Sequence, residues 1–349
     1  MDDRGMEKID ISIIVPVFNG EAYLATLLDS LSSQSGVSFE IIAINDGSSD
    51  GSAAILTDRA RRHSFLRVIH QPNQGLSIAR NQGIAQAKGQ WVAFADCDDW
   101  LAPNALQIWL QQATEQQLDL LIGNGYRFCG EPTQQSVKPL LPEQRWQKTL
   151  TGKQWIIHSV AQNNWLHFCW LQLIRRELIQ AHQLTFTPHQ LHEDILWTTR
   201  LALAAQRVNY CPEPLYGYRT APHSITRKHC FHLRMLRAAS YLDIISELVR
   251  IAAQSEPVLS KALLRHANRE SGQLLGLTRW QTRTCAERSQ LARRFKELGL
   301  EMPLIRGAIG LRDFWRALRC IIIFRRYARQ KPSLKADKRV CHRGSWPDA

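Results

Sequence analysis

The sequence predicts an α/β fold, in which a mainly parallel sheet with flanking helices precedes a basic helical region. Two observations predict this architecture. Over the first hundred residues, short runs rich in Ile and Val alternate with helical patterns, and this alternation is typical of right-handed βαβ units. Beyond about residue 226, basic helical patterns replace the strand-like runs and continue to about residue 330.

The first strand and helix set the pattern. Residues 11–17 read ISIIVPV, a run dominated by β-branched residues that suits a strand buried on both faces. Apolar residues at helical spacing then predict an amphipathic helix at 21–33. The later elements are a strand at 40–44, a helix capped by Ser49 or Asp50 that ends near Arg62, a strand at 66–70, a helix at 77–87 and a strand at 91–95. Ligands bind at the carboxyl ends of such strands, and the polar clusters of this sequence lie there.

The middle of the chain, residues 118–218, is less regular. It contains an aromatic run at 165–174 and an amphipathic helix at 195–206, and Pro212-Glu213-Pro214 is expected to break regular structure. We therefore expect a catalytic domain at 1–225, a helical basic region at 226–330 and a disordered tail at 331–349.

Charge divides the chain in the same way. The net charge is +13, and from Arg227 onward 26 Lys and Arg stand against 10 Asp and Glu, so the preceding part is slightly acidic. The eight cysteines include no C-x-x-C pair, which favours reduced thiols over a zinc site or a disulfide framework. The first ten residues lack a signal-peptide pattern, and no apolar stretch reaches the roughly 20 residues of a membrane span. We expect a cytoplasmic protein.

Three carboxylates follow the strand at 91–95, in the run Phe94-Ala95-Asp96-Cys97-Asp98-Asp99-Trp100. Ionised carboxylates this close repel one another unless a cation or a hydroxyl network neutralises them. Mg²⁺ or Mn²⁺ binds through one or two carboxylates together with substrate phosphate oxygens. In an Asp-x-Asp pair, one side chain can reach the metal while the other holds a ribose hydroxyl. Taken alone, an acidic turn that caps the next helix explains this pair at least as well.

Two further clusters suit a nucleotide. Asp46, in Asn45-Asp46-Gly47-Ser48, can accept a hydrogen bond from the imide N–H of uracil, and Gly47 lets the backbone turn closely beneath the base. Arg80 can reach the base or a phosphate. Taken separately, an ordinary Asp-Gly turn and a solvated arginine explain these residues better.

Glu193-Asp194 precedes the helix at 195–206 and offers a candidate base. An inverting sugar transfer needs one positioned group to take the proton of the acceptor hydroxyl. Acidic residues in a first helical turn are also stabilised by the helix dipole without any function. Arg219, after Tyr216-Gly217-Tyr218, can supply positive charge to a leaving diphosphate.

The order of these motifs resembles that of family 2 glycosyltransferases with the GT-A fold, across roughly residues 10–225. The resemblance also covers Pro16, Phe18 and Asn19 after the first strand, and Asn73-Gln74-Gly75. It implies an inverting, metal-dependent transfer of one hexosyl group from a nucleoside-diphosphate sugar, preferably UDP-linked. The acceptor would be a hydroxyl of a glycan or lipid-linked saccharide in bacterial surface polysaccharide or lipopolysaccharide biosynthesis.

The resemblance also implies residue roles. Asp194 would be the base, supported by Glu193, and Asp96 and Asp98 would hold Mg²⁺ or Mn²⁺. The residues expected to bind the donor are Pro16, Asn19, Glu21, Asp46, Gly47, Arg80, Asp96 and Arg219.

Two features depart from the wider family. Gln172 stands where the family often has lysine, which puts a phosphate contact there in doubt. The Gln-x-x-Arg-Trp motif of processive polysaccharide synthases is missing from the sequence, which favours addition of a single sugar.

The basic segment at 312–329 mixes arginines with large apolar residues. It suits peripheral binding to an anionic membrane, on the inner face of the cytoplasmic membrane. A helix packed on the catalytic body is the equal alternative. Other readings of the whole chain are a sugar-phosphate nucleotidyltransferase, a nucleic-acid-binding protein and an inactive relative. The sequence lacks the glycine-rich arginine loop of the first and the recognition modules of the second, so we expect no nucleic-acid partner.

Overall fold

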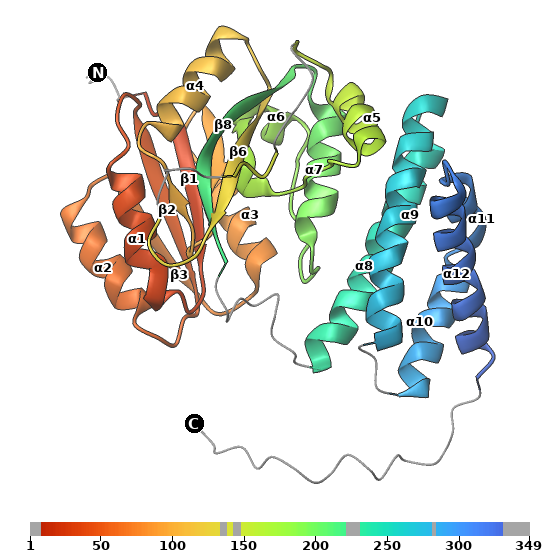
Figure 1. Cartoon of the computed structure of the whole chain (residues 1–349). Coiled ribbons are helices and arrows are strands. Elements are labelled where there is room, and N and C mark those ends of the chain that lie inside the picture. The colour runs from red at the N-terminus through yellow and green to blue at the C-terminus, as the bar shows by residue number, and fades with distance from the viewer. Residues whose placement is uncertain (1–7, 133–137, 142–147, 221–230, 281–283, 331–349) are drawn as a thin grey trace, which may run out of the picture. The chain divides into compact units, whose positions relative to one another are not determined.

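The computed structural model describes residues 8–132, 138–141, 148–220, 231–280 and 284–330. The chain divides into two compact units. The sheet unit comprises residues 1–228 and 251–263, and the helical unit comprises residues 229–250 and 264–349. Figure 1 shows the sheet in the first unit and the succession of helices that follows it.

The first part of the sheet unit alternates strands and helices as predicted. Its elements are β1 (Ile11–Val17), α1 (Glu21–Ser32), β2 (Phe39–Asp46), α2 (Ser52–Arg62), β3 (Leu66–Gln71), α3 (Leu76–Gln86) and β4 (Trp91–Phe94). These strands pair in parallel in the order β3-β2-β1-β4. The predicted βαβ arrangement is therefore confirmed for this part of the chain.

Helices cover both faces of these strands. Ile13 and Val15 of β1 belong to the large core that also contains the apolar face of α1. On the opposite face, Ile42 and Ile44 of β2 pack with Ala79 of α3. Since neighbouring residues of a strand point to opposite faces, both odd and even positions must be apolar. This explains why β1 is apolar at every position except Ser12, whose buried hydroxyl donates to Glu40 Oε1 (2.7 Å).

The second part of the sheet is mixed. Its elements are β5 (Trp100–Leu101), α4 (Ala105–Glu115), β6 (Leu120–Phe128), α5 (Gly152–Gln162), the 3-10 turn η1 (Cys169–Leu171), β7 (Gln172–Arg175), α6 (Arg176–Ala181), α7 (Glu193–Ala204) and β8 (Val208–Arg219). Among the described residues the strand order is β3-β2-β1-β4-β7-β6-β8-β5. Strands β7 and β5 run antiparallel to their neighbours, whereas β6 and β8 pair in parallel.

The segment Pro212-Glu213-Pro214 interrupts the pairing of β8, as expected, but does not end the strand. Strand β8 continues through this segment, and its register against β6 shifts between Ile122 and Gly125, as in a β-bulge. The Asn124 side chain hydrogen-bonds to backbone groups at the bulge. Its Nδ2 donates to the Pro212 carbonyl (2.9 Å), and its Oδ1 accepts from the Gly125 N–H (2.9 Å). Proline cannot donate to the ladder, and the bulge accommodates that loss inside the strand.

The predicted C-terminal helices are present. They are α8 (Phe231–Ala253), α9 (Pro257–Trp280), α10 (Cys285–Glu297), α11 (Glu301–Arg306) and α12 (Leu311–Ala328). Within the helical unit, the rings of Phe295 and Phe324 join α10 to α12 with centroids 4.7 Å apart. The predicted domain boundary at 225–226 and the predicted disordered tail at 331–349 lie outside the described residues. In the part of the chain that is described, the helices lack the combination of length and apolar character that a bilayer span requires.

Candidate active site

The carboxyl ends of β1, β2 and β4 bring three polar turns to one edge of the sheet. Residues 18–20 follow β1, residues 47–51 follow β2 and residues 95–99 follow β4. Because β1 pairs in parallel with both β2 and β4, these turns are neighbours. This is the edge at which the sequence predicts the donor site.

The turns after β1 and β2 are tied to each other by hydrogen bonds. Asn19 has a left-handed φ of 53°, and its Oδ1 accepts from the Ser49 N–H (2.8 Å). Glu21, at the start of α1, accepts at Oε2 from the Gly51 N–H (2.8 Å). Pro16 lies inside β1. Asn19 and Glu21 therefore brace the two turns, and the donor contacts expected of these residues and of Pro16 stay predictions.

Asp46 ends β2 and organises the loop that leads into α3. Its Oδ1 accepts from Gln71 Nε2 and from the Gln74 N–H, and its Oδ2 accepts from the Gly75 N–H, each at 2.8 Å. A carboxylate has about four acceptor positions, so one position on Oδ2 is left for a ligand. Gly47 follows with φ of 71°, and a Cβ there would lie 2.6 Å from a backbone nitrogen of the facing loop. The turn therefore requires glycine.

Asp99 is the structural member of the acidic turn after β4. It is fully buried, its Oδ2 accepts from the Tyr216 hydroxyl (2.7 Å), and its Oδ1 accepts from the Arg219 N–H (2.8 Å). The Tyr216 hydroxyl accepts in turn from the Asp96 N–H (3.1 Å). Asp99 therefore anchors the turn to β8.

Asp98 has the surroundings of a metal ligand. It is half-buried, and burial together with the like charge of Asp96 raises the pKa of Asp98 to about 6. A divalent cation would relieve this repulsion, and carboxylate oxygens suit Mg²⁺ or Mn²⁺. No group of three or more His, Cys, Asp or Glu side chains is placed to hold a metal in the described part of the chain. Two carboxylates fit a cation whose remaining ligands are substrate phosphate oxygens and water.

Arg80 of α3 bridges the acidic turn and the start of α7. Its side chain is buried, its Nη1 donates to Glu193 Oε1 (2.5 Å), and its Nη2 donates to Asp96 Oδ1 (2.9 Å). Burial alone would lower the pKa of Arg80, but the surrounding acidic groups outweigh burial and raise the pKa, so the side chain is cationic. Both terminal nitrogens are engaged by carboxylates. The expected contact of Arg80 with the base stays a prediction, and the bridge was not anticipated from the sequence.

Helix α7 begins at Glu193, so Glu193 and Asp194 occupy its first turn instead of preceding it. Asp194 is half-buried, and burial followed by the like charge of Glu193 raises the pKa of Asp194 well above the usual carboxyl range. A helix N-terminus would lower that pKa, so burial and like charge outweigh the dipole. A carboxylate with a raised pKa is a stronger proton acceptor, which favours a base over a residue that only stabilises the helix end.

Arg219 ends β8 beside the acidic turn. Its Nε donates to the Asp98 carbonyl (2.7 Å) and its Nη1 donates to the Gly130 carbonyl (2.6 Å). Its guanidinium lies 4.5 Å from the ring centroids of both Tyr23 and Phe128. These contacts fix a positive charge next to the two carboxylates, as a residue near a leaving diphosphate would require.

A stack of aromatic rings beside the acidic turn was not predicted. Trp170 of η1 stacks on Phe168, Tyr216 and Tyr218, with ring centroids 4.8, 4.5 and 5.4 Å away. Since Tyr216 also binds Asp99, the stack shares an anchor with the acidic turn. The aromatic run and the Tyr-x-Tyr pair are visible in the sequence, but periodicity does not reveal that they meet.

Gln172 is used inside the protein. Its side chain is buried, its Nε2 donates to Thr198 Oγ1 (2.8 Å), and its Oε1 accepts from Trp197 Nε1 (3.1 Å). Gln172 thus joins β7 to α7. A phosphate contact at this position has no support in the structure.

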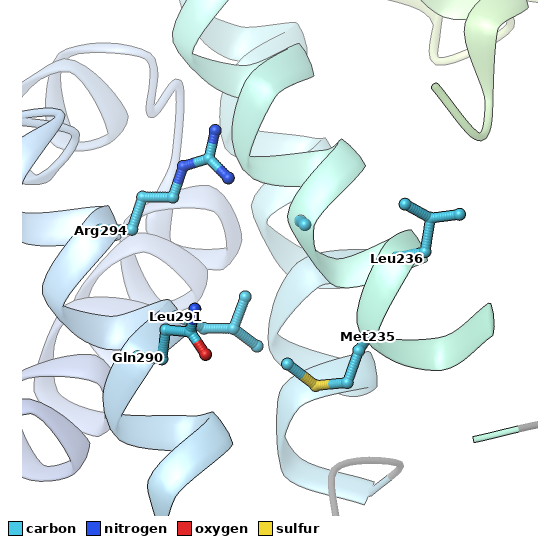
Figure 2. A pocket seen from close by; sticks show the side chains of 6 residues that line it. Met235, Leu236, Gln290, Leu291 and Arg294 are labelled. Atoms are coloured by element: carbon cyan, nitrogen blue, oxygen red, sulfur yellow. The ribbon is translucent and has the colours of Figure 1, made fainter. Parts of the chain in front are cut away.

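A separate pocket of about 220 Å³ lies in the helical unit, where α8 and α10 supply its walls (Figure 2). The lining residues are Met235, Leu236, Ala239, Gln290, Leu291 and Arg294. Arg294 is already ion-paired with Asp243 (2.5 Å). The pocket contains none of the predicted site residues, and its lining brings no carboxylate or imidazole.

Known proteins resemble this chain over the segments that build the acidic site. Residues 12–181 match the family model described as Glycosyl transferase family 2. The match begins in β1 and ends with α6, so it includes the acidic turn and stops before Glu193.

Two curated relatives and one solved structure extend the likeness. The uncharacterized glycosyltransferase YibD of Escherichia coli K12 is 36% identical over 224 residues, which are 63% of this chain and 64% of YibD. The putative glycosyltransferase EpsH of Bacillus subtilis 168 is 35% identical over 230 residues, 64% of each chain. The chain thus spans slightly less than two thirds of these relatives. The structure of S. aureus TarS 1–349 in complex with UDP shares the fold, with a TM-score of 0.64 at 20% identity over 91% of this chain and 90% of that chain.

Proposed function

Since the sheet unit of this chain is a family 2 glycosyltransferase domain with the GT-A fold, we propose that the protein transfers one hexosyl group from a nucleoside-diphosphate donor to an acceptor hydroxyl, with inversion at the anomeric carbon. The acceptor is a glycan or lipid-linked saccharide of bacterial surface polysaccharide or lipopolysaccharide biosynthesis, met on the cytoplasmic side of the membrane. The observation that carries the proposal is the Arg80 bridge, because it joins the acidic turn to the first turn of α7.

The donor is UDP-linked in this proposal. Asp46 has one acceptor position left, which suits the imide N–H of uracil, and Gly47 keeps the backbone close beneath the base. The S. aureus protein of similar fold was crystallised with UDP and with UDP-GlcNAc, which supports the same nucleotide here. Asn19 and Glu21 complete the donor site by holding the two turns that would border the nucleotide, and Pro16 of β1 precedes the first of these turns.

Asp96 and Asp98 would hold a Mg²⁺ or Mn²⁺ ion, with Asp96 also within reach of the ribose. When bound, the cation supplies positive charge that stabilises the departing diphosphate. Arg219 contributes a second, permanent positive charge at the same end of the site. Arg80 keeps Asp96 oriented, because its Nη2 donates to one of the two carboxylate oxygens.

Asp194 accepts the proton of the acceptor hydroxyl. As that proton leaves, the hydroxyl oxygen forms a bond to the anomeric carbon, and the bond from this carbon to the diphosphate oxygen breaks with its electron pair going to the diphosphate. Attack from the face opposite the leaving group inverts the configuration. Glu193, held by Arg80, keeps a negative charge beside Asp194 and so maintains its affinity for the proton.

A thermal-shift screen of nucleotide sugars with and without Mn²⁺ tests the proposal, because a ligand that binds the folded protein raises its melting temperature, and a tighter ligand raises it more. We expect stabilisation by a UDP-sugar that requires Mn²⁺ and is lost in Asp98→Asn. Asp194→Asn should retain the shift but lose transfer, and Asp58→Asn, at an exposed aspartate of α2, should change neither. A shift that survives both chelator and Asp98→Asn, or normal transfer by Asp194→Asn, would refute the assignment.

A further inference from the structure

We propose that one exposed face of α12 docks the protein onto an anionic membrane surface. This inference goes beyond the sugar transfer and depends on the arrangement of side chains along a single helix. The inner face of α12 packs within the helical unit, where Ala317, Cys320 and Phe324 are buried. The outer face carries two different rows of side chains.

The first row is apolar. Leu311, Trp315 and Ile322 are 79%, 62% and 56% exposed, although all three are large hydrophobic residues. Their separations of four and seven residues place them on one side of the helix. Single exposed apolar residues are common on proteins, but a row of large ones indicates a binding surface.

The second row is cationic. Arg312, Arg319 and Arg326 recur every seven residues, so they form a line beside the apolar row. All three are exposed, and none makes a hydrogen bond or ion pair with a described residue. In contrast, Arg316 and Arg325 of the same helix are ion-paired within the helical unit. Three positive charges are therefore uncommitted next to exposed apolar surface.

An anionic lipid surface offers a binding partner to both the apolar row and the cationic row. Apolar side chains of an interfacial helix enter the boundary between head groups and acyl chains, while arginines reach the lipid phosphates. A nucleic acid would engage the arginines but leave the apolar row in water. A second copy of the chain, meeting this face across a two-fold axis, would bury the apolar row but oppose two like-charged rows. Charge complementarity therefore favours the membrane.

Vesicle flotation of the full-length chain tests this proposal without any sugar donor, so its outcome is independent of the proposed function. We expect binding to vesicles of phosphatidylcholine mixed with phosphatidylglycerol, weak binding to phosphatidylcholine alone, and weakening as salt rises. Replacing the three arginines of the cationic row with glutamine should weaken binding to the anionic vesicles roughly 100-fold, since each arginine contributes about a fivefold factor. Trp315→Ser combined with Ile322→Ser should weaken binding on the order of tenfold.

The matched control replaces three exposed arginines of other helices and strands with glutamine, so that the net charge changes equally. These residues are Arg61, Arg127 and Arg293. Circular dichroism of each variant checks that the helices are retained. If the control weakens binding as much as the cationic-row variant does, binding is diffuse and the proposal fails. It also fails if the wild-type chain does not float, or if the apolar variant only abolishes self-association in light scattering.

Discussion

Replacing Arg80 with methionine removes the bridge between α3, the acidic turn and α7. The Arg80 side chain is 3% exposed, and its partners Glu193 and Asp96 are 9% and 29% exposed. Removing one member of a buried ion pair costs about 3–5 kcal/mol, because the remaining charge stays buried without compensation. Most of this cost comes from the loss of the Arg80–Glu193 pair, since Asp96 is partly solvated. We therefore expect Arg80→Met to lower the free energy of unfolding of the sheet unit by about 3 kcal/mol near pH 8.

The pH dependence of this loss identifies its cause. Without Arg80, the Glu193 carboxylate stays buried with no cation beside it. A buried carboxylate without a partner costs stability only in its ionised form, so the penalty is largest at about pH 8 and shrinks toward about pH 5. Urea unfolding followed by tryptophan fluorescence at both pH values measures the loss in free energy of unfolding. The buried Trp91 and Trp197 report on the sheet unit.

Arg62→Met is the matched control. Arg62 pairs with Asp58 at 2.9 Å, but the two side chains are 64% and 52% exposed, so the same chemical change should cost less than about 1 kcal/mol. Arg80→Lys keeps the charge but not the two-pronged geometry, and its loss should fall between the two. Equal losses for Arg80→Met and Arg62→Met, or a loss that is the same at both pH values, would refute the reasoning.

Three further predictions concern Asp194, Glu270 and Tyr216. Asp194→Asn should lower kcat about 10²- to 10⁴-fold with donor KM unchanged. Because the pKa of Asp194 is raised, the ascending limb of the wild-type pH–rate profile should lie above the usual carboxyl range. Steady-state kinetics across pH measures both effects. Burial raises the pKa of Glu270 to about 7, so the folded protein loses stability as the pH rises from about 4.5 to 7. Glu270→Gln should therefore be more stable than the wild type by up to about 3 kcal/mol near pH 8 and nearly equal to it near pH 4, as measured by urea unfolding. Tyr216→Phe removes a donor to buried Asp99 and should cost about 1–3 kcal/mol in thermal unfolding, whereas Tyr126→Phe, whose buried hydroxyl has no partner among the described residues, should cost much less.

The first part of the fold was predictable because its signals are local. A strand buried on both faces is apolar at most positions, and the helices between such strands show their own period, so β1 to β4 follow from the sequence. The antiparallel placement of β7 between β4 and β6 was not predictable, because it depends on pairing between distant segments. The irregularity at Pro212-Glu213-Pro214 could be expected from its prolines, but its hydrogen-bonding partner Asn124 lies on another strand and could not.

The places of the predicted site residues at the strand ends could be predicted from the sequence, but the contacts between their side chains could not. Asp46 and the acidic turn were expected at strand ends, and they lie there because parallel strands share one edge. The bond from Arg80 to Glu193 joins residues 113 positions apart, and no local pattern encodes such a contact. The sequence assigns Asp98 to the metal through its Asp-x-Asp spacing with Asp96, but it gives no role to Asp99. The packing of β8 shows that Asp99 is enclosed and structural, whereas Asp98 is half-buried.

The enclosed position of Asp99 changes how mutagenesis of the acidic turn should be interpreted. Both oxygens of Asp99 hold β8 in place, through the Tyr216 hydroxyl and the Arg219 amide. An inactive Asp99 variant would consequently report a displaced strand and a misplaced guanidinium, not the loss of an ion. A substitution at position 99 also removes the hydrogen-bond acceptors of residues 216 and 219, so the effects of substitutions at these three positions should not be additive.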